Sequence, residues 1–120
     1  MSFQVLGETE LHRGPIVSMQ SLRIRTPDGS EIDRQVVRHP GAVAVVPLLA
    51  DGETVIMVRQ YRAALDADVL ELPAGKLDVQ NEALTVAAQR ELVEEIGRRA
   101  GRFDLLAEFL NSPGFTDERC

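Results

Sequence analysis

The chain has 120 residues, of which 44% are apolar and 27% charged, a composition that suits one compact globular domain and disfavours intrinsic disorder. Its longest apolar run, residues 41–50, is far shorter than the roughly 20 residues that a membrane-spanning helix needs. The N-terminus lacks the pattern of a secretory signal, and the lone cysteine, Cys120, cannot form an internal disulfide. We therefore expect a cytoplasmic protein with no membrane partner.

Charge and aromatic content disfavour nucleic acid as a partner. Thirteen basic and nineteen acidic residues give a net charge of −6, which opposes binding to a phosphate backbone. The densest basic cluster, Arg98, Arg99 and Arg102, follows a predicted helix, where cations complement the helix dipole. With no Trp, one Tyr and four Phe, the chain offers no evident set of aromatic platforms for stacked bases.

Strands are predicted in the first forty residues. Residues 16–25 and 31–38 flank the turn cluster at 26–30, where Pro27 presets φ and Gly29 accepts a positive φ, so we expect a hairpin. Both arms carry many charges. A hairpin that is apolar on only part of its surface is marginal alone, so it should pack against the main body or a second subunit.

The middle of the chain predicts a central hairpin. Residues 42–49 and 54–60 are apolar runs on either side of the strong turn signal Asp51-Gly52. A short strand is predicted at residues 69–72, before Pro73. A further strand is predicted near the C-terminus, where apolar side chains alternate at Phe103, Leu105, Ala107 and Phe109.

Residues 82–96 are good helix formers and predict the one convincing helix. Asn81 is a candidate N-cap, and Gly97 is the expected C-terminal stop. The helical period places one apolar side of this helix toward the core, and that side is made of Ala88, Leu92, Val93 and Ile96.

Three carboxylates share one face of this predicted helix. Glu91, Glu94 and Glu95 are spaced i, i+3 and i+4, within an arc of about 100°. A hard divalent cation such as Mg²⁺ or Mn²⁺ would relieve their repulsion, and Arg90 is placed to hold Glu94 by a charge-assisted hydrogen bond. Taken alone, the three glutamates also fit a solvated acidic face.

A wider pattern favours the metal site. Gly75, Glu82 and the segment Arg90-Glu91-Leu92-Val93-Glu94-Glu95-Ile96-Gly97 resemble the Nudix box, Gly-x5-Glu-x7-Arg-Glu-U-x-Glu-Glu-x-Gly-U with U aliphatic. This box is the signature of hydrolases that cut a nucleoside diphosphate linked to another group. The chain departs from it twice, with six residues between Gly75 and Glu82 and with Arg98 in the last aliphatic place. Neither departure changes the helix register.

Four further segments resemble the ADP-ribose pyrophosphatase branch of the Nudix family, namely residues 39–43, 58–62, 71–75 and 112–118. The resemblance implies an α/β class, with an α/β/α sandwich around a mixed sheet and an N-terminal β-hairpin region. It implies a homodimer in which residues 1–38 form the dimerisation region, and a catalytic domain at 39–120 that lacks its C-terminal part. It also implies metal-dependent hydrolysis of ADP-ribose, or a related nucleoside diphosphate sugar, to AMP and ribose 5-phosphate.

The resemblance also implies roles for individual residues. Glu91, Glu95 and the backbone carbonyl of Ala74 resemble metal ligands, with Glu94 acting through water or on a further ion. Arg62 resembles a phosphate contact, with an ordinary loop cation as the alternative. Glu118 resembles a carboxylate near the terminal ribose or the attacking water, with a solvated loop acid as the alternative. Glu82 either reaches the metal shell or, as we prefer, favours the helix dipole.

The general base is left open. In the resembled branch it is usually a glutamate on a later loop, so either this chain is a fragment, which we favour, or Glu118 or Glu94 serves. A non-hydrolysing sensor of ADP-ribose or a related nucleotide, and a hydrolase of another dinucleotide such as NADH, remain alternatives. His12 and His39 lie too far apart in sequence to predict a zinc site, and the lone Cys120 is not predicted to act as a nucleophile.

Overall fold

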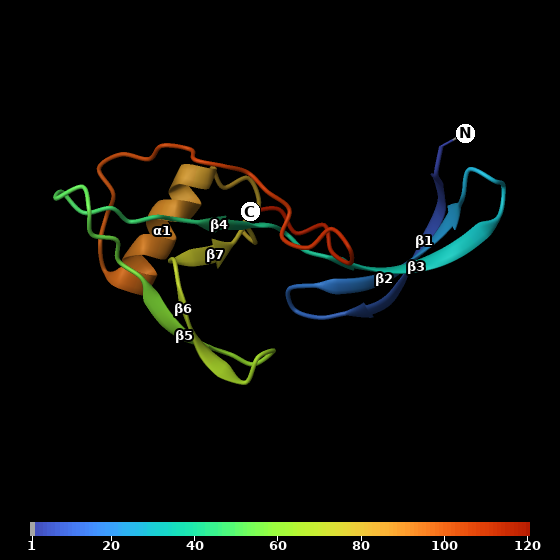
Figure 1. Cartoon of the computed structure of the whole chain (residues 1–120), viewed down its shortest axis with the longest axis horizontal. Coiled ribbons are helices and arrows are strands. Elements are labelled where there is room, and N and C mark those ends of the chain that lie inside the picture. The colour runs from blue at the N-terminus through green and yellow to red at the C-terminus, as the bar shows by residue number, and fades with distance from the viewer. Residues whose placement is uncertain (1) are drawn as a thin grey trace. The chain divides into compact units, whose positions relative to one another are not determined.

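The computed structural model describes residues 2–120 and confirms the α/β class (Figure 1). The chain forms two compact units. Residues 2–41 and 108–120 make up the sheet unit, and residues 42–107 make up the helix unit. Across the described residues, no helix is long and apolar enough to cross a bilayer. In chain order the elements are β1 (Gln4–Arg13), β2 (Ser18–Arg25), β3 (Glu31–Arg38), β4 (Ala42–Ala44), β5 (Val58–Arg62), β6 (Ala67–Glu71), β7 (Ala74–Lys76) and α1 (Leu84–Ile96).

The sheet unit contains a three-stranded antiparallel sheet in the order β1-β2-β3. The predicted hairpin is confirmed as β2 and β3, which pair without interruption from Ser18 opposite Arg38 to Arg25 opposite Glu31. Its turn is tied together by Asp28, which accepts hydrogen bonds from the side chains at both ends of the turn, and by Gly29 at φ 90°. All ten residues of β1 are exposed, and the register of its pairing with β2 shifts at two places.

The C-terminal segment extends the edge of β3. Thr116 forms a parallel bridge to Val37, whose N–H donates to the carbonyl of Phe115. Phe109 and Cys120 exchange a pair of backbone hydrogen bonds that closes this segment into a loop. The strand predicted from the alternation at Phe103, Leu105, Ala107 and Phe109 was wrong, because no described strand pairs with these residues and Leu105 stays 78% exposed.

The helix unit pairs its strands differently from the sequence prediction. The predicted central hairpin was wrong except at its turn, where Leu48 bridges Val55 and Asp51 accepts three hydrogen bonds. Beyond the turn, β4 pairs with β7 and β5 pairs with β6. The first arm cannot continue as a ladder, because Pro47 has no N–H and the N–H of Val45 already donates to Pro73.

Helix α1 packs against β7 and β4 (Figure 1). Its buried apolar residues are Ala87, Ala88 and Leu92. The predicted packing face was wrong at Val93, which is 44% exposed, and Ile96 is half-buried. The buried side of the helix starts one residue earlier than predicted, so Ala87 is buried instead of Val93.

The ends of α1 were predicted unequally well. Gly97 is confirmed as the C-cap, with φ 65° and N–H groups of residues 97 and 98 returning to Val93 and Leu92. The predicted N-cap was wrong, because Asn81 lies in a left-handed turn and the helix begins after Ala83. The basic cluster lies beyond the cap, so the last turn of this described helix holds no basic side chain.

Candidate active site

Glu91 is the buried carboxylate of the site. It lies on the side of α1 that faces β7 and is 8% exposed, so it is not on an outward acidic face. Its carboxyl group occupies the space next to Gly75 where any Cβ would overlap it. Burial raises the pKa of Glu91, against the opposing effect of the Arg90 charge, and the neighbouring Glu94 and Glu95 raise it further. Gly75 is therefore required here for close approach of a carboxylate to the strand.

Glu95 joins α1 to two strands of the helix unit. One of its carboxylate oxygens accepts a hydrogen bond from the side-chain amide of Gln60 at 3.3 Å, and the other accepts one from the backbone N–H of Ala74 at 3.1 Å. The structure therefore brings Ala74 and Glu95 together through the N–H of Ala74, whereas the predicted role of Ala74 uses its carbonyl. Sequence reasoning gave no role to Gln60, although its position two residues before Arg62 places both on one face of β5.

Arg90 binds three carboxylates, and its pattern differs from the prediction. It donates two hydrogen bonds to Glu82, at 3.0 and 3.3 Å, and one to Glu91 at 2.9 Å. The predicted hydrogen bond to Glu94 is absent, because that carboxylate is 58% exposed and lies 3.7 Å away. Glu82 raises the pKa of Arg90 by hydrogen bonding. Since Glu82 precedes the helix by two residues, its partner is Arg90 and not the first turn of α1.

The three glutamates of the box do not converge on one point. Glu91 turns toward β7 while Glu94 faces solvent, and residues 2–120 contain no group of three or more His, Cys, Asp or Glu side chains placed to hold a metal ion. The donor chemistry of Glu91 and Glu95 nevertheless fits a hard divalent cation, since both offer carboxylate oxygens. A cation there would offset the mutual repulsion that raises the pKa of Glu91.

Arg62 and Glu71 form a two-point ion pair on the β5–β6 hairpin. The guanidinium donates hydrogen bonds of 2.7 and 2.8 Å to the two oxygens of Glu71. This pairing raises the pKa of Arg62 and lowers that of Glu71, and Glu95 adds to the rise at Arg62. Arg62 lies on a strand with a half-exposed side chain, and sequence reasoning missed its partner. The fork geometry leaves one guanidinium nitrogen without a hydrogen bond to Glu71.

Glu118 belongs to the sheet unit, and its described contacts are there. Its carboxylate lies 3.7 Å from Nε2 of His39. Next to it, Asp117 accepts hydrogen bonds from the backbone N–H of His39 at 2.9 Å and from Arg38 at 3.2 Å. Arg38 also donates to Glu8 at 2.9 Å. The segment that carries Glu118 is thus fixed to the end of β3 by side chains as well as by backbone.

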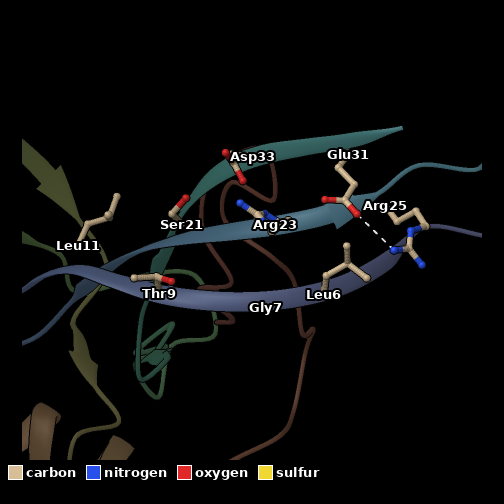
Figure 2. A pocket seen from close by; sticks show the side chains of 9 residues that line it. All are labelled: Leu6, Gly7, Thr9, Leu11, Ser21, Arg23, Arg25, Glu31 and Asp33. Atoms are coloured by element: carbon tan, nitrogen blue, oxygen red, sulfur yellow. Dashed lines mark hydrogen bonds and ion pairs between the residues drawn. The ribbon is translucent and has the colours of Figure 1, made fainter. Parts of the chain in front are cut away.

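The sheet unit also has a hollow on one face of its sheet, shown in Figure 2, that sequence reasoning missed. Leu6 and Leu11 of β1 line it beside Arg23 of β2, and Arg25 pairs there with Glu31 at 3.2 Å. These β2 and β3 side chains share a face because they occupy alternate strand positions in register. The hollow therefore combines apolar side chains with charges of both signs.

Comparisons with known proteins identify the family that the chain matches. Residues 38–119 match the family model described as "NUDIX domain". The chain is 40% identical over 109 residues to a methanol dehydrogenase activator of Bacillus methanolicus, covering 91% of this chain and 58% of that protein. It is also 40% identical over 116 residues to an ADP-ribose pyrophosphatase of Mycobacterium tuberculosis, covering 97% of this chain and 56% of that protein.

A solved structure supports the fold. The crystal structure of an ADP compounds hydrolase superposes with a TM-score of 0.84 at 22% identity, covering 99% of this chain and 64% of that one. At this identity the likeness concerns the fold. The chain spans less than two thirds of the length of each of these three proteins.

Proposed function

The chain belongs to the NUDIX family, and on that premise we propose that it forms the carboxylate site of a hydrolase that cleaves the pyrophosphate bond of ADP-ribose or a related nucleoside diphosphate sugar. The products would be AMP and ribose 5-phosphate. The relative from Mycobacterium tuberculosis bears the name ADP-ribose pyrophosphatase, which supports this substrate class.

One observation carries the proposal. The carboxylates of Glu91 and Glu95 are both fixed against β7, the first beside Gly75 and the second on the N–H of Ala74. A solvated acidic face would instead leave both side chains extended into water and free of backbone contacts. The burial of Glu91 is costly for a charged group, and a function that needs a fixed carboxylate accounts for it.

The proposed cofactor is Mg²⁺ or Mn²⁺, ligated by Glu91 and Glu95, with Glu94 acting through water and the carbonyl of Ala74 as a further ligand. When bound, the cation supplies charge neutralisation at the pyrophosphate and lowers the pKa of a water nucleophile. Arg90 keeps Glu91 oriented through its hydrogen bond, and Gln60 does the same for Glu95. Arg62 binds a phosphate oxygen, for which its unpaired guanidinium nitrogen is suited.

Glu118 is proposed as a substrate-binding carboxylate near the terminal ribose. Its partial exposure, 24% of the side chain, leaves it accessible to a hydroxyl group. Glu118 or Glu94 is the candidate general base on this chain, since each is a carboxylate that is not engaged in a short ion pair.

A homodimer through residues 1–38 is part of the same proposal. The hollow of Figure 2 supports it, because Arg23 and Asp33 lie on one face and a self-complementary interface needs charges of both signs on the same surface. Leu11, which is 50% exposed, would be buried in such an interface. Analytical ultracentrifugation of the wild type and of Leu11→Lys tests this point. A dimer that the substitution dissociates is expected, and a monomeric wild type would contradict it.

The decisive assay is AMP release from ADP-ribose with and without Mg²⁺, with NADH as a parallel substrate. We expect metal-dependent AMP release, reduced about 100-fold or more in Glu91→Gln and in Glu95→Gln while the circular dichroism spectrum is kept. Glu53→Gln, at an exposed position of the same unit, is the matched control and should keep full activity. Unchanged metal-dependent activity in both site variants would contradict the assignment of Glu91 and Glu95 as metal ligands. Tight ADP-ribose binding without product would favour a sensor instead.

A further inference from the structure

We propose that His39 is a positioning residue that orients the carboxylate of Glu118, a role that rests on the proposed substrate contact of Glu118. The juxtaposition is of two half-buried side chains, His39 at 14% and Glu118 at 24% exposure. All groups involved belong to the sheet unit.

The ring of His39 is anchored by the turn that follows it. The backbone N–H of Gly41 donates a hydrogen bond to Nδ1 of His39 at 2.9 Å. A ring nitrogen that accepts a hydrogen bond carries no proton, so the neutral ring bears its proton on Nε2. Gly41 adopts φ 97°, a conformation that favours glycine, and Pro40 has no N–H to compete as a donor.

The protonated nitrogen faces Glu118. The distance from Nε2 to the nearer carboxylate oxygen is 3.7 Å, which is longer than a hydrogen bond, so the contact is between the N–H dipole of the neutral ring and the carboxylate. Among the described residues, His39 is the basic side chain that lies within 4.0 Å of the Glu118 carboxylate. The neighbouring Arg38 pairs with Glu8 and Asp117 instead. His39 therefore sets the preferred direction of the carboxylate by electrostatic attraction.

The backbone on both sides of the pair is fixed. The N–H of Glu118 donates to the hydroxyl of the buried Thr116 at 3.2 Å, and its carbonyl accepts from Asn111 at 3.1 Å. The N–H of His39 donates to Asp117 at 2.9 Å. With both backbones fixed, Glu118 can still move by rotation of its side chain. In the structure this side chain points its carboxylate toward the His39 ring.

Two isosteric substitutions separate the ring's two contacts. In His39→Asn the side-chain oxygen replaces Nδ1 and keeps the Gly41 hydrogen bond, but nothing reaches Glu118. In His39→Gln the amide nitrogen reaches the position of Nε2. We expect His39→Asn to match Glu118→Gln in its change of KM and of kcat for ADP-ribose, and His39→Gln to stay within about twofold of the wild type. The double variant His39→Asn/Glu118→Gln should be no worse than Glu118→Gln, because both changes remove one interaction.

The control is His12→Asn, since His12 is the other histidine of the chain and is exposed on β1. It should leave both kinetic constants unchanged. Additive losses in the double variant would overturn the proposal, as would a neutral Glu118→Gln in an active enzyme.

A spectroscopic readout keeps this test independent of hydrolysis. With two histidines, imidazole ¹⁵N spectra of the wild type and of His12→Asn assign His39 directly. We expect the Nε2–H tautomer, with the Nε2 resonance shifting more than Nδ1 in Glu118→Gln. A proton on Nδ1, or no response to that substitution, would overturn the contact. A wild type that releases no AMP would overturn the proposed function alone, because the spectra still test the contact.

Discussion

The two units of this chain are stabilised in different ways. In the sheet unit, β2 and β3 form eight consecutive residue pairs, and the turn between them is closed by its own side chains. In the helix unit, β5 and β6 pair over five residues and β4 and β7 over three, and the side chain of Glu95 on α1 accepts a hydrogen bond from the backbone N–H of Ala74. The position of α1 in the helix unit therefore depends on contacts between residues distant in sequence, whereas the β2–β3 hairpin of the sheet unit is closed by local pairing.

The two units also differ in how they hold their carboxylate side chains. Among the described residues, the carboxylates on the exposed strand β1, Glu8 and Glu10, are held by the partly exposed cations Arg38 and Arg13 and accept no hydrogen bond from strand backbone. Glu91 and Glu95 are instead positioned by Gly75, Ala74 and Gln60, which lie far from them in sequence. The helix unit thus fixes Glu91 and Glu95 through residues that are distant from them in sequence.

Replacing Leu92 by Ala is expected to have the largest effect, because Leu92 is 2% exposed in the small core under α1. The expected loss is about 2–5 kcal/mol in the free energy of unfolding, measured by urea denaturation. Leu22→Ala is the matched change in the sheet unit, where the side chain is 8% exposed and backbone pairing carries more of the stability. An equal or larger loss in Leu22→Ala would contradict the contrast between the units.

Gly75→Ala should displace the carboxylate of Glu91, since the added Cβ would occupy its place. We expect a loss of about 1–3 kcal/mol in stability from overpacking and a roughly 100-fold loss of Mg²⁺-dependent activity. Gly101→Ala is the control, because no atom lies within 4 Å of its added Cβ. If Gly75→Ala kept wild-type activity, the position of Glu91 against β7 would not matter for the reaction.

The same contrast explains what could be predicted from the sequence. The β2–β3 hairpin and the Gly97 cap follow from turn residues adjacent to the elements they end, so local signals sufficed. The box spacing located Glu91 and Glu95 but not the burial of Glu91, which depends on the absence of a side chain at Gly75. The pairing of β4 with β7 was missed because nothing near Ala42 in sequence indicates a partner thirty residues away.

Glu71→Gln tests whether the helix unit also fixes the guanidinium group of Arg62. The substitution leaves the shape of the side chain but weakens the two-point pair with Arg62. Since both side chains are partly solvated, we expect a moderate effect, a rise of about 3–10-fold in KM for ADP-ribose with kcat little changed. Asp104→Asn, which weakens an exposed pair with Arg102 in the same unit, should change neither constant. A fall in kcat alone would argue against a substrate-binding role for Arg62.

The smallest expected effect concerns the two turns, one in each unit, where side-chain hydrogen bonds lower the pKa of Asp28 and of Asp51 from 3.8 to about 2. A folded-state pKa below the unfolded one gives stability that is present above pH 3.8 and is lost as the pH falls toward 2. Asn substitutions keep the shape but not the charge, so Asp28→Asn and Asp51→Asn should lower the free energy of unfolding at pH 6, with the difference from wild type shrinking on acidification. Urea denaturation at pH 6 and near pH 2 measures this difference in the free energy of unfolding. A difference that does not change with pH would show that shape alone closes these turns.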